Sequence, residues 1–235
     1  MKKPVILGVA SVSRLWLNNF ADVKILNVGA LHDAIMARDR NVPLLSVSNH
    51  ISTLDDPVMW GGLLTNRMIS ELIDRNQMRH VLAAKDIIFT NPIFSWFFST
   101  GQAIPIVRGD GIFQAGMQHC LDVMNLGRWL HFFPEGRVIQ NNNFIGRLKW
   151  GIGRIVMESE RPPVIIPIIL RGFDVMKPLD CLPRPFKQVR IIVGEPVNSS
   201  LFLQSTSHVS NQDERRSMIT QQIQGLLNKT LEKAL

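Results

Sequence analysis

The strongest chemical signal in the sequence is a histidine followed five positions later by an aspartate, His50 and Asp55. A neutral imidazole, with an ordinary pKa near ~6.5, can accept a proton at physiological pH. A carboxylate on the other ring nitrogen fixes the tautomer and stabilises the imidazolium that forms. The pair therefore predicts general-base catalysis, and no serine or cysteine nucleophile is required if the substrate supplies its own hydroxyl.

Spacing alone does not identify a catalytic pair, because His208 and Asp213 stand the same distance apart. That second pair lies in a polar stretch with no apolar strand before it, and we interpret it as a coincidence. The pair His50 and Asp55 directly follows the apolar run 42–48 and precedes an Asp-Pro step. This context favours the first pair as the catalytic one.

Two further segments place charged residues where an apolar run ends. The uncharged run 103–107 is followed by Arg108, whose planar guanidinium can bind a phosphate. The run 129–133 leads into Glu135, Gly136 and Arg137. Arg137 can bind an anionic head group, Glu135 can orient it or accept a hydrogen bond from substrate, and N–H groups around Gly136 can stabilise an oxyanion. The alternatives are a solvated arginine at a turn and a surface ion pair of little energetic value.

A fourth segment carries Lys149 and Arg154 on either side of Trp150, a pattern suited to contact with a phosphate or head group at an interface. His131 alternates into the predicted sheet and is more typical of a hydrogen-bonded core residue than of a catalytic one. Cys120 and the second cysteine are too few for a disulfide framework. No group of His, Cys and carboxylate residues has metal-ligand spacing, so the sequence predicts neither a metal nor a cofactor.

The elements that must position these residues alternate between short apolar runs and helical patterns. A length of 235 residues suits one domain with a sizeable core. The runs predict buried strands at 42–48, 80–84, 103–107, 129–133, 164–170 and 189–193, and the helical patterns lie at 57–79, 112–126 and 213–235. For the helix at 57–79, Asp56 is the expected N-cap, with proline at the first helical position. This order predicts an α/β fold, a single domain with a mostly parallel or mixed central sheet surrounded by helices.

Charge and apolar patterning indicate contact with a membrane. The formal net charge is +7, which favours either nucleic acid or an anionic membrane surface. Residues 87–107 carry no charge and are long enough to cross a bilayer, but two prolines and a glycine break the helix. Their aromatic side chains predict a short interfacial helix followed by a buried strand, with an ordinary core helix as the open alternative. Residues 4–13 follow two lysines and predict an uncleaved surface helix. A signal peptide and an import signal are the less favoured alternatives.

These segments, in this order, resemble the glycerolipid acyltransferase family, which includes glycerol-3-phosphate and lysophosphatidate acyltransferases. The sequences NHISTLDDPVMWG at 49–61, FPEGRV at 133–138 and LKWGIGR at 148–154 look most like the tafazzin branch and its plant relatives. The resemblance covers about residues 40 to 196. It divides the single domain into an N-terminal interfacial helical segment (1–40), an acyltransferase core (41–200) and a C-terminal helix (201–235).

The resemblance implies that His50 is the general base and that Asp55 orients it. It places the head-group site at Arg108, Glu135, Gly136 and Arg137, to which the basic Lys149 is added by its position. Members of the tafazzin branch move acyl chains from a phospholipid to a lysophospholipid, typically monolysocardiolipin, without free coenzyme A, in mitochondrial membranes facing the intermembrane space. Plant relatives use acyl-CoA as a co-substrate or N-acylate phosphatidylethanolamine. A monotopic, membrane-associated enzyme with phospholipid and lysophospholipid substrates is therefore expected.

Two other classes of function stay open at this point. In a hydrolase, His50 would activate water, although no Gly-x-Ser-x-Gly elbow is present. A basic peripheral membrane or nucleic-acid binder would need no chemistry, but the sequence contains no recognisable nucleic-acid module. The acyl donor, the acceptor head group, the chain-length preference and the oligomeric state are not determined by the sequence.

Overall fold

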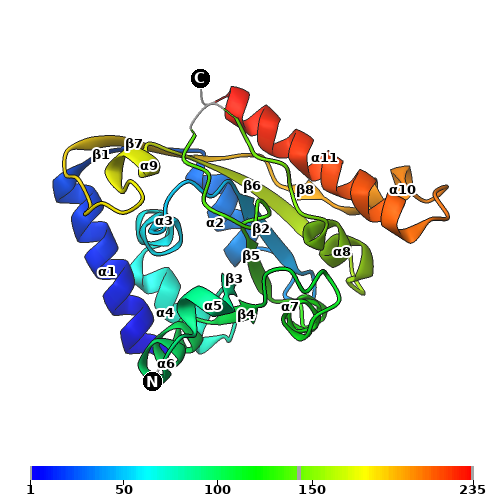
Figure 1. The fold of residues 1–235 in the computed structure, drawn as a ribbon, viewed down its shortest axis with the longest axis horizontal. Coiled ribbons are helices and arrows are strands. Elements are labelled where there is room, and N and C mark those ends of the chain that lie inside the picture. The colour runs from blue at the N-terminus through cyan, green and yellow to red at the C-terminus, as the bar shows by residue number, and fades with distance from the viewer. Residues whose placement is uncertain (1, 142–143, 234–235) are drawn as a thin grey trace.

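The computed structural model describes residues 2–141 and 144–233, which form a mixed sheet covered by helices on both faces (Figure 1). The strands are β1 (Ala21–Leu26), β2 (Leu44–Ser48), β3 (His80–Ala84), β4 (Ala103–Ile106), β5 (Trp129–Phe132), β6 (Val164–Arg171), β7 (Lys187–Val193) and β8 (Val197–Asn198). Their order is β1-β7-β6-β2-β5-β3-β4, with β8 beside β6. Strands β6, β2, β5, β3 and β4 run parallel, whereas β7 is antiparallel to β6 and parallel to β1. The predicted fold class is confirmed.

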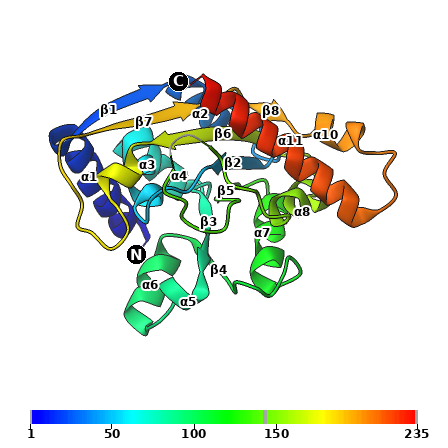
Figure 2. The same cartoon turned by 45° about the horizontal axis from the view of Figure 1, so that its top comes forward.

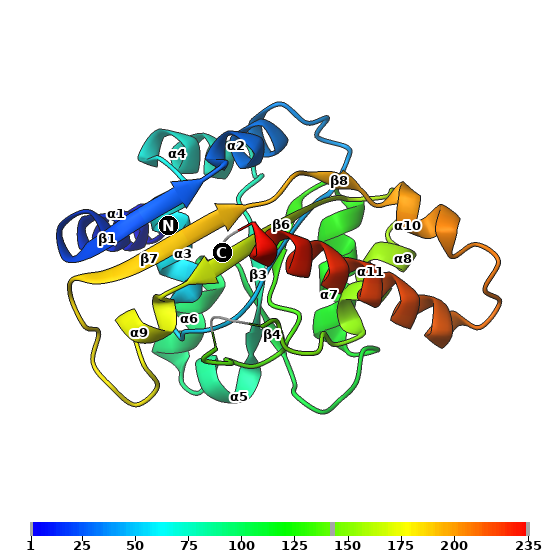
Figure 3. The same cartoon turned by 90° about the horizontal axis from the view of Figure 1, so that it is seen from above.

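The helices occupy both faces of the sheet because its central strands are apolar on both sides. They are α1 (Lys2–Phe20), α2 (Val28–Met36), α3 (Asp55–Leu63), α4 (Asn66–Asp74), α5 (Lys85–Ile88), α6 (Pro92–Thr100), α7 (Ala115–Asn125), α8 (Gly151–Glu158), α9 (Phe173–Met176), α10 (Ser200–Ser205) and α11 (Gln212–Glu232). Leu44 of β2 packs in the core under α1–α4, and its neighbour Leu45 packs in the core under α7, α8 and α11 (Figure 3). Alternation along each strand thus builds two cores around one sheet.

The six predicted strands are confirmed, whereas the predicted single helix at 57–79 is wrong. The chain is extended at Leu64, and the Thr65 side chain accepts a hydrogen bond from the Met68 N–H, so that a second helix, α4, begins there. The expected N-cap is also wrong, because α3 already begins at Asp55 and Asp56 lies in its first turn. A local capping signal inside an apolar pattern therefore divided one predicted helix into two.

The first forty residues contribute more than a surface helix. Helix α1 crosses α3 closely because Gly61 has no side chain, and a Cβ there would lie 2.5 Å from the Cβ of Ser13. The chain then forms β1, a strand not expected from the sequence, which pairs with β7 at the edge of the sheet. Residues 201–235 likewise hold two helices, α10 and α11, rather than one. The described parts of both terminal segments, 2–40 and 201–233, are therefore packed into the single domain.

The uncharged segment 87–107 folds as a short helix, α6, followed by the edge strand β4. Among the described residues, no helix combines the length and the apolar character that crossing a bilayer requires. Helices α5 and α6 protrude from the body of the protein (Figure 2). Their exposed apolar side chains are Ile87, Ile93, Phe94, Trp96 and Phe97, which together we call the α5–α6 knob.

Candidate active site

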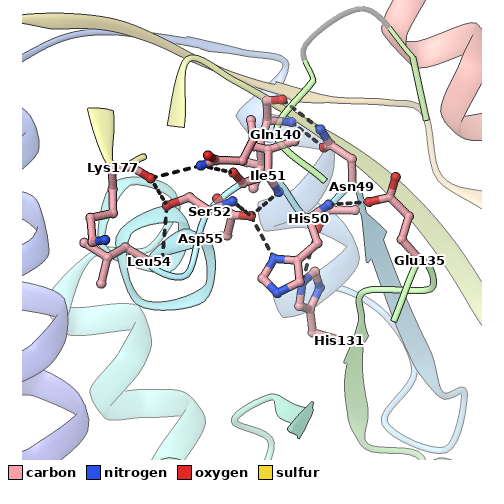
Figure 4. A network of polar contacts seen from close by, with 12 residues as sticks. Asn49, His50, Ile51, Ser52, Leu54, Asp55, His131, Glu135, Gln140 and Lys177 are labelled. Carbon is pink, nitrogen blue, oxygen red and sulfur yellow. Dashed lines mark hydrogen bonds and ion pairs between the residues drawn. The ribbon is translucent and has the colours of Figure 1, made fainter. Parts of the chain in front are cut away.

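The predicted catalytic pair lies beyond the carboxyl end of β2, in the loop that leads into α3 (Figure 4). The Nδ1 of His50 is 2.9 Å from Oδ2 of Asp55. With Nδ1 donating to the carboxylate, Nε2 is left as the proton acceptor, and the side chain is 23% exposed. In open α/β sheets this edge is where ligands bind. The structure therefore brings the two residues together in the arrangement that general-base catalysis needs.

Asp55 is completely buried and all its hydrogen bonds converge on one oxygen. Its Oδ2 accepts the backbone N–H groups of Ile51 at 2.7 Å and Ser52 at 2.9 Å, in addition to His50. Burial raises the pKa of Asp55, and the hydrogen bond and charge of His50, followed by the two backbone N–H groups, act against this rise. The carboxylate is thus held in a single orientation, with its charge directed at the imidazole.

One face of the His50 ring is covered by an aromatic side chain. Phe133, at the end of β5, stacks on His50 with ring centroids 4.3 Å apart, and its ring meets His131 edge-on at 4.5 Å. His131 is fully buried, and its Nδ1 lies 2.9 Å from Oγ of Ser46. Burial holds the pKa of His131 well below its ordinary value. His131 is therefore a neutral, hydrogen-bonded core residue, as the sequence indicates, and not a second base.

Glu135 joins two loops rather than pointing into solvent. It is buried, its Oε2 accepts the backbone N–H of His50 at 2.7 Å, and its Oε1 accepts the backbone N–H of Gly146 at 2.6 Å. Burial raises the pKa of this carboxyl, and the two N–H donors counteract the rise. The backbone carbonyl of His50 in turn accepts the N–H of Ile139 at 2.7 Å. Glu135 thus fixes the backbone of His50 against the loop that follows β5.

The substitution Glu135→Gln is expected to destabilise the protein by about 1–3 kcal/mol, because the amide nitrogen would face a backbone N–H that has lost its acceptor. Chemical denaturation of the two proteins at neutral pH measures this difference. Glu160→Gln is the matched control, since Glu160 is exposed and its substitution should leave stability unchanged. An equal stability of all three proteins would contradict the positioning role of Glu135.

Three of the remaining predicted residues, Gly136, Arg137 and Lys149, lie between β5 and α8, in the segment that also carries Glu135. Gly136 has a φ of 69°, a left-handed conformation that favours glycine, and its N–H donates to the carbonyl of Phe133 at 3.1 Å. That N–H is therefore engaged in a turn rather than directed at a substrate. The Lys149 side chain passes close by, since a Cβ on Gly136 would lie 3.4 Å from its Cγ. Arg137 and Lys149 are both exposed, so this turn presents two cations to solvent beside the loop that carries Glu135.

Arg108 lies apart from the catalytic pair. It follows β4, and β5 and β3 stand between β4 and β2 in the sheet, a separation of about 14 Å at ordinary strand spacing. Its guanidinium pairs with Asp86 of α5, and this hydrogen bond lowers the pKa of the Asp86 carboxyl. Both side chains are exposed, so Arg108 marks the base of the α5–α6 knob.

Two polar residues complete the site through contacts with distant segments, and only the first of them, Asn49, carries a signal in the sequence. The side chain of Asn49 exchanges two hydrogen bonds with the backbone of Leu170, at 2.9 and 2.8 Å, and so holds the start of the catalytic loop against β6. Gln140 donates to the carbonyls of Ile51 and Lys177, at 3.2 and 3.3 Å (Figure 4). Asn49 lies inside the recognised motif, but the other contacts join segments far apart in the chain.

Within the described ranges, no group of three or more His, Cys, Asp or Glu residues could hold a metal ion. The second His–Asp pair of equal spacing is not a site, because Asp213 forms an ion pair with Arg216 at 2.8 Å, and His208 is exposed. Cys120 is buried, and burial raises the pKa of its thiol, so it is no nucleophile at neutral pH.

The sequence of residues 32–171 matches the acyltransferase family. The chain belongs to that family. Its most similar relatives include an N-acylphosphatidylethanolamine synthase from Arabidopsis thaliana, 42% identical over 206 residues, and the tafazzins of Drosophila melanogaster and Dictyostelium discoideum, 36% and 37% identical. These alignments cover 83%, 94% and 74% of this acyltransferase, and 70%, 58% and 65% of the respective relatives. The tafazzin-like resemblance is thereby confirmed.

A solved structure shares the fold of this acyltransferase. The lysophosphatidate acyltransferase PlsC of Thermotoga maritima superposes with a TM-score of 0.63, covering 99% of this chain and 79% of its own, at 14% sequence identity. At that identity the likeness establishes the fold alone. Family and fold together identify the protein as an acyltransferase enzyme, and the His50–Asp55 pair fits that chemistry.

Proposed function

We propose that the protein transfers an acyl chain from a phospholipid to a lysophospholipid, with monolysocardiolipin as the typical acceptor. The observation that carries this proposal is the pair His50 and Asp55, 2.9 Å apart, which can activate a hydroxyl brought by the substrate. The similarity to tafazzins over most of the chain supports the substrate class.

The reaction follows from the geometry of the pair. The free hydroxyl of the lysophospholipid gives its proton to Nε2 of His50 as its oxygen attacks the ester carbonyl of the donor. The imidazolium that forms is stabilised by Asp55, and it then protonates the leaving alkoxide, which departs as the hydroxyl of a new lysophospholipid. One ester bond forms and one breaks, so that no cofactor is required.

The cations around this edge of the sheet would hold the phosphate groups. Arg137 and Lys149 are exposed beside the loop that carries Glu135 and would bind the acceptor head group, with Gly136 leaving room for it. Arg108, at the base of the α5–α6 knob, would meet a phosphate at the membrane surface. Glu135 contributes by fixing the backbone of His50 rather than by binding the head group directly.

A second candidate function is N-acylation of phosphatidylethanolamine. It is favoured by the 42% identity to the plant N-acylphosphatidylethanolamine synthase, of which this chain covers 70%. In that reaction the same histidine would take a proton from the ethanolamine amine, and acyl-CoA would be a possible donor.

Acyl transfer is tested with purified protein and liposomes that contain a labelled phospholipid donor. Monolysocardiolipin or phosphatidylethanolamine is offered as acceptor, with and without acyl-CoA, and the label is followed by mass spectrometry. Transfer to monolysocardiolipin without acyl-CoA would establish the proposed reaction. Transfer only from acyl-CoA, or only to the amine, would assign the enzyme to the alternative branch, and release of free fatty acid would indicate a hydrolase.

The same resemblance supports a place on a mitochondrial membrane that faces the intermembrane space. Monotopic attachment is supported by the α5–α6 knob, whose Ile93 side chain is 75% exposed. Apolar and aromatic side chains on a short protruding helix suit insertion to the depth of the head groups.

The double substitution Ile93→Ser/Trp96→Ser is expected to lower partitioning to anionic phospholipid vesicles about tenfold or more, because it removes two apolar side chains from the buried contact. Vesicle co-sedimentation measures the effect. Leu126→Ser/Leu201→Ser is the matched control, since both leucines are 59% exposed but lie outside the knob. Equal partitioning of the two double variants would refute the knob as the attachment point.

A further inference from the structure

Helix α3 begins with two adjacent carboxylates that point to different partners. Asp55 reaches His50, as described above. Asp56 instead accepts the indole N–H of Trp60 at 3.0 Å through Oδ1, and its Oδ2 accepts a short hydrogen bond from Nη2 of Arg79. Asp55 thus binds His50, whereas Asp56 connects the same helical turn to Arg79, the residue before β3.

Arg79 is an unusual partner because it is buried. Its guanidinium carbon lies 5.6 Å from the centre of the Trp60 ring, and its Nε and Nη1 are buried with no hydrogen-bond partner. Burial lowers the pKa of Arg79, and the charge of Asp56 counteracts this. A buried ion pair adds little net stability, because the desolvation of both charges offsets their attraction. Stability alone therefore gives a weak reason for placing this pair beside the catalytic loop.

A series of aromatic ring contacts connects the ion pair of Asp56 and Arg79 to His50. Trp60 meets the ring of His131 edge-on at 5.1 Å, His131 meets Phe133, and Phe133 stacks on His50. The charge of Arg79 also helps to keep the pKa of His131 low. The ion pair is thus linked indirectly to His50 and Asp55 by two routes, through the backbone of α3 and through the rings of Trp60, His131 and Phe133.

We propose that Asp56 and Arg79 are positioning residues for acyl transfer. Their ion pair fixes the first turn of α3, whose N-cap residue Leu54 makes no side-chain capping hydrogen bond, and thereby holds the carboxylate of Asp55 on Nδ1 of His50. The two aspartates share one peptide unit, so a rotation of this turn moves both carboxylates together. A misplacement of about 1 Å in a catalytic group can cost on the order of 10²-fold in rate. The inference rests on the proposed acyl transfer.

The decisive variant is the double substitution Asp56→Asn/Arg79→Gln, which removes both charges and leaves no unpaired buried ion. If the pair positions Asp55, kcat falls about 10- to 100-fold while KM stays within about twofold, measured well below the melting temperature of the variant. If the pair only stabilises the fold, kcat stays near the wild-type value, and the proposal is overturned.

Arg216→Gln supplies the matched control. The Arg216 side chain is 10% exposed and pairs with Glu158, which is 26% exposed. Arg79 and Asp56 have the same two exposures. Arg216 differs in its place, because it lies on α11, against the core on the opposite face of the sheet. Its substitution should lower the melting temperature and leave kcat unchanged. An equal loss of kcat in both variants would also overturn the proposal, because it would indicate a general loosening of the protein.

A second readout does not depend on substrate. The Nδ1 proton of His50, bonded to a carboxylate, should give a downfield proton resonance that is assigned by its loss in His50→Ala. This resonance should shift or broaden in the Asp56→Asn/Arg79→Gln protein and stay in place in Arg216→Gln. Failure of the wild-type protein to transfer any acyl chain would refute the proposed function, whereas an unchanged resonance in the double variant would refute the positioning role.

Discussion

Replacing His50 by alanine is expected to abolish measurable acyl transfer while the protein stays folded. Neither titratable neighbour can take the proton instead, because Asp55 is buried with its hydrogen-bonding oxygen occupied, and His131 of β5 is fully buried with a pKa well below its ordinary value. General-base catalysis typically contributes ~10²–10⁴ in rate, and kcat should fall by at least that factor. Single-turnover transfer between labelled liposomes measures the loss.

His208→Ala is the matched control for this substitution. His208 has an aspartate at the same spacing, but it is exposed and its aspartate pairs with Arg216. Its replacement should leave the rate and the far-ultraviolet circular dichroism spectrum unchanged. A folded His50→Ala protein with more than a tenth of the wild-type rate would remove His50 from the mechanism.

The substitution Asp55→Asn is expected to reduce kcat by at least ~10²-fold. If the amide oxygen takes the place of Oδ2, the imidazole keeps its tautomer but loses the charge that stabilises the imidazolium. If the amide nitrogen faces Nδ1 instead, the ring proton moves to Nε2 and the base is lost. In a serine-protease triad the second outcome costs about 10⁴ in kcat. Asp213→Asn, at the same spacing from His208, should retain full activity.

This loss of activity should not be accompanied by a large loss of stability. Burial raises the pKa of Asp55, which means that its ionised form costs free energy in the folded protein at neutral pH. A neutral amide avoids that cost, and one amide oxygen can accept both backbone N–H groups that now share Oδ2. Its NH2 group, however, would replace the buried Oδ1, which has no hydrogen-bond partner. These two effects oppose each other, so the melting temperature of Asp55→Asn should stay within about 5 °C of the wild-type value at pH 7.5.

The raised pKa of Asp55 also fixes how the stability difference between Asp55→Asn and the wild type changes with pH. Because the folded-state pKa of Asp55 is raised, the wild-type protein takes up a proton there at a higher pH than the unfolded chain does, and the cost of the buried charge disappears on acidification. Any advantage of Asp55→Asn in melting temperature should shrink as the pH falls through this raised pKa. An advantage that grows on acidification would contradict the assignment of a costly buried charge. A strongly destabilised Asp55→Asn protein at neutral pH would contradict it as well.

The residue types along the chain determined the fold class, six of the eight strands in the described residues, and the pairing of His50 with Asp55. Strands such as β2 were predictable because a short apolar run bounded by polar residues is typical of a buried strand, whereas a buried helix needs a longer run. His50 and Asp55 were predictable because they are local: five residues of a single loop and helix start bring them to 2.9 Å. The family motifs could be recognised for the same reason, since each lies within one continuous segment.

Tertiary structure decided what depends on segments far apart in the sequence. Strand β1 was missed because its partner β7 lies more than 160 positions later, and only that pairing makes the run a strand. The role of Glu135 changed from a candidate head-group ligand to a bridge between two backbone N–H groups. The link from Asp56 to Arg79 could not be read from spacing. A buried carboxylate binds whichever donors the folded chain brings within about 3 Å, and the sequence gives the carboxylate but not its donors.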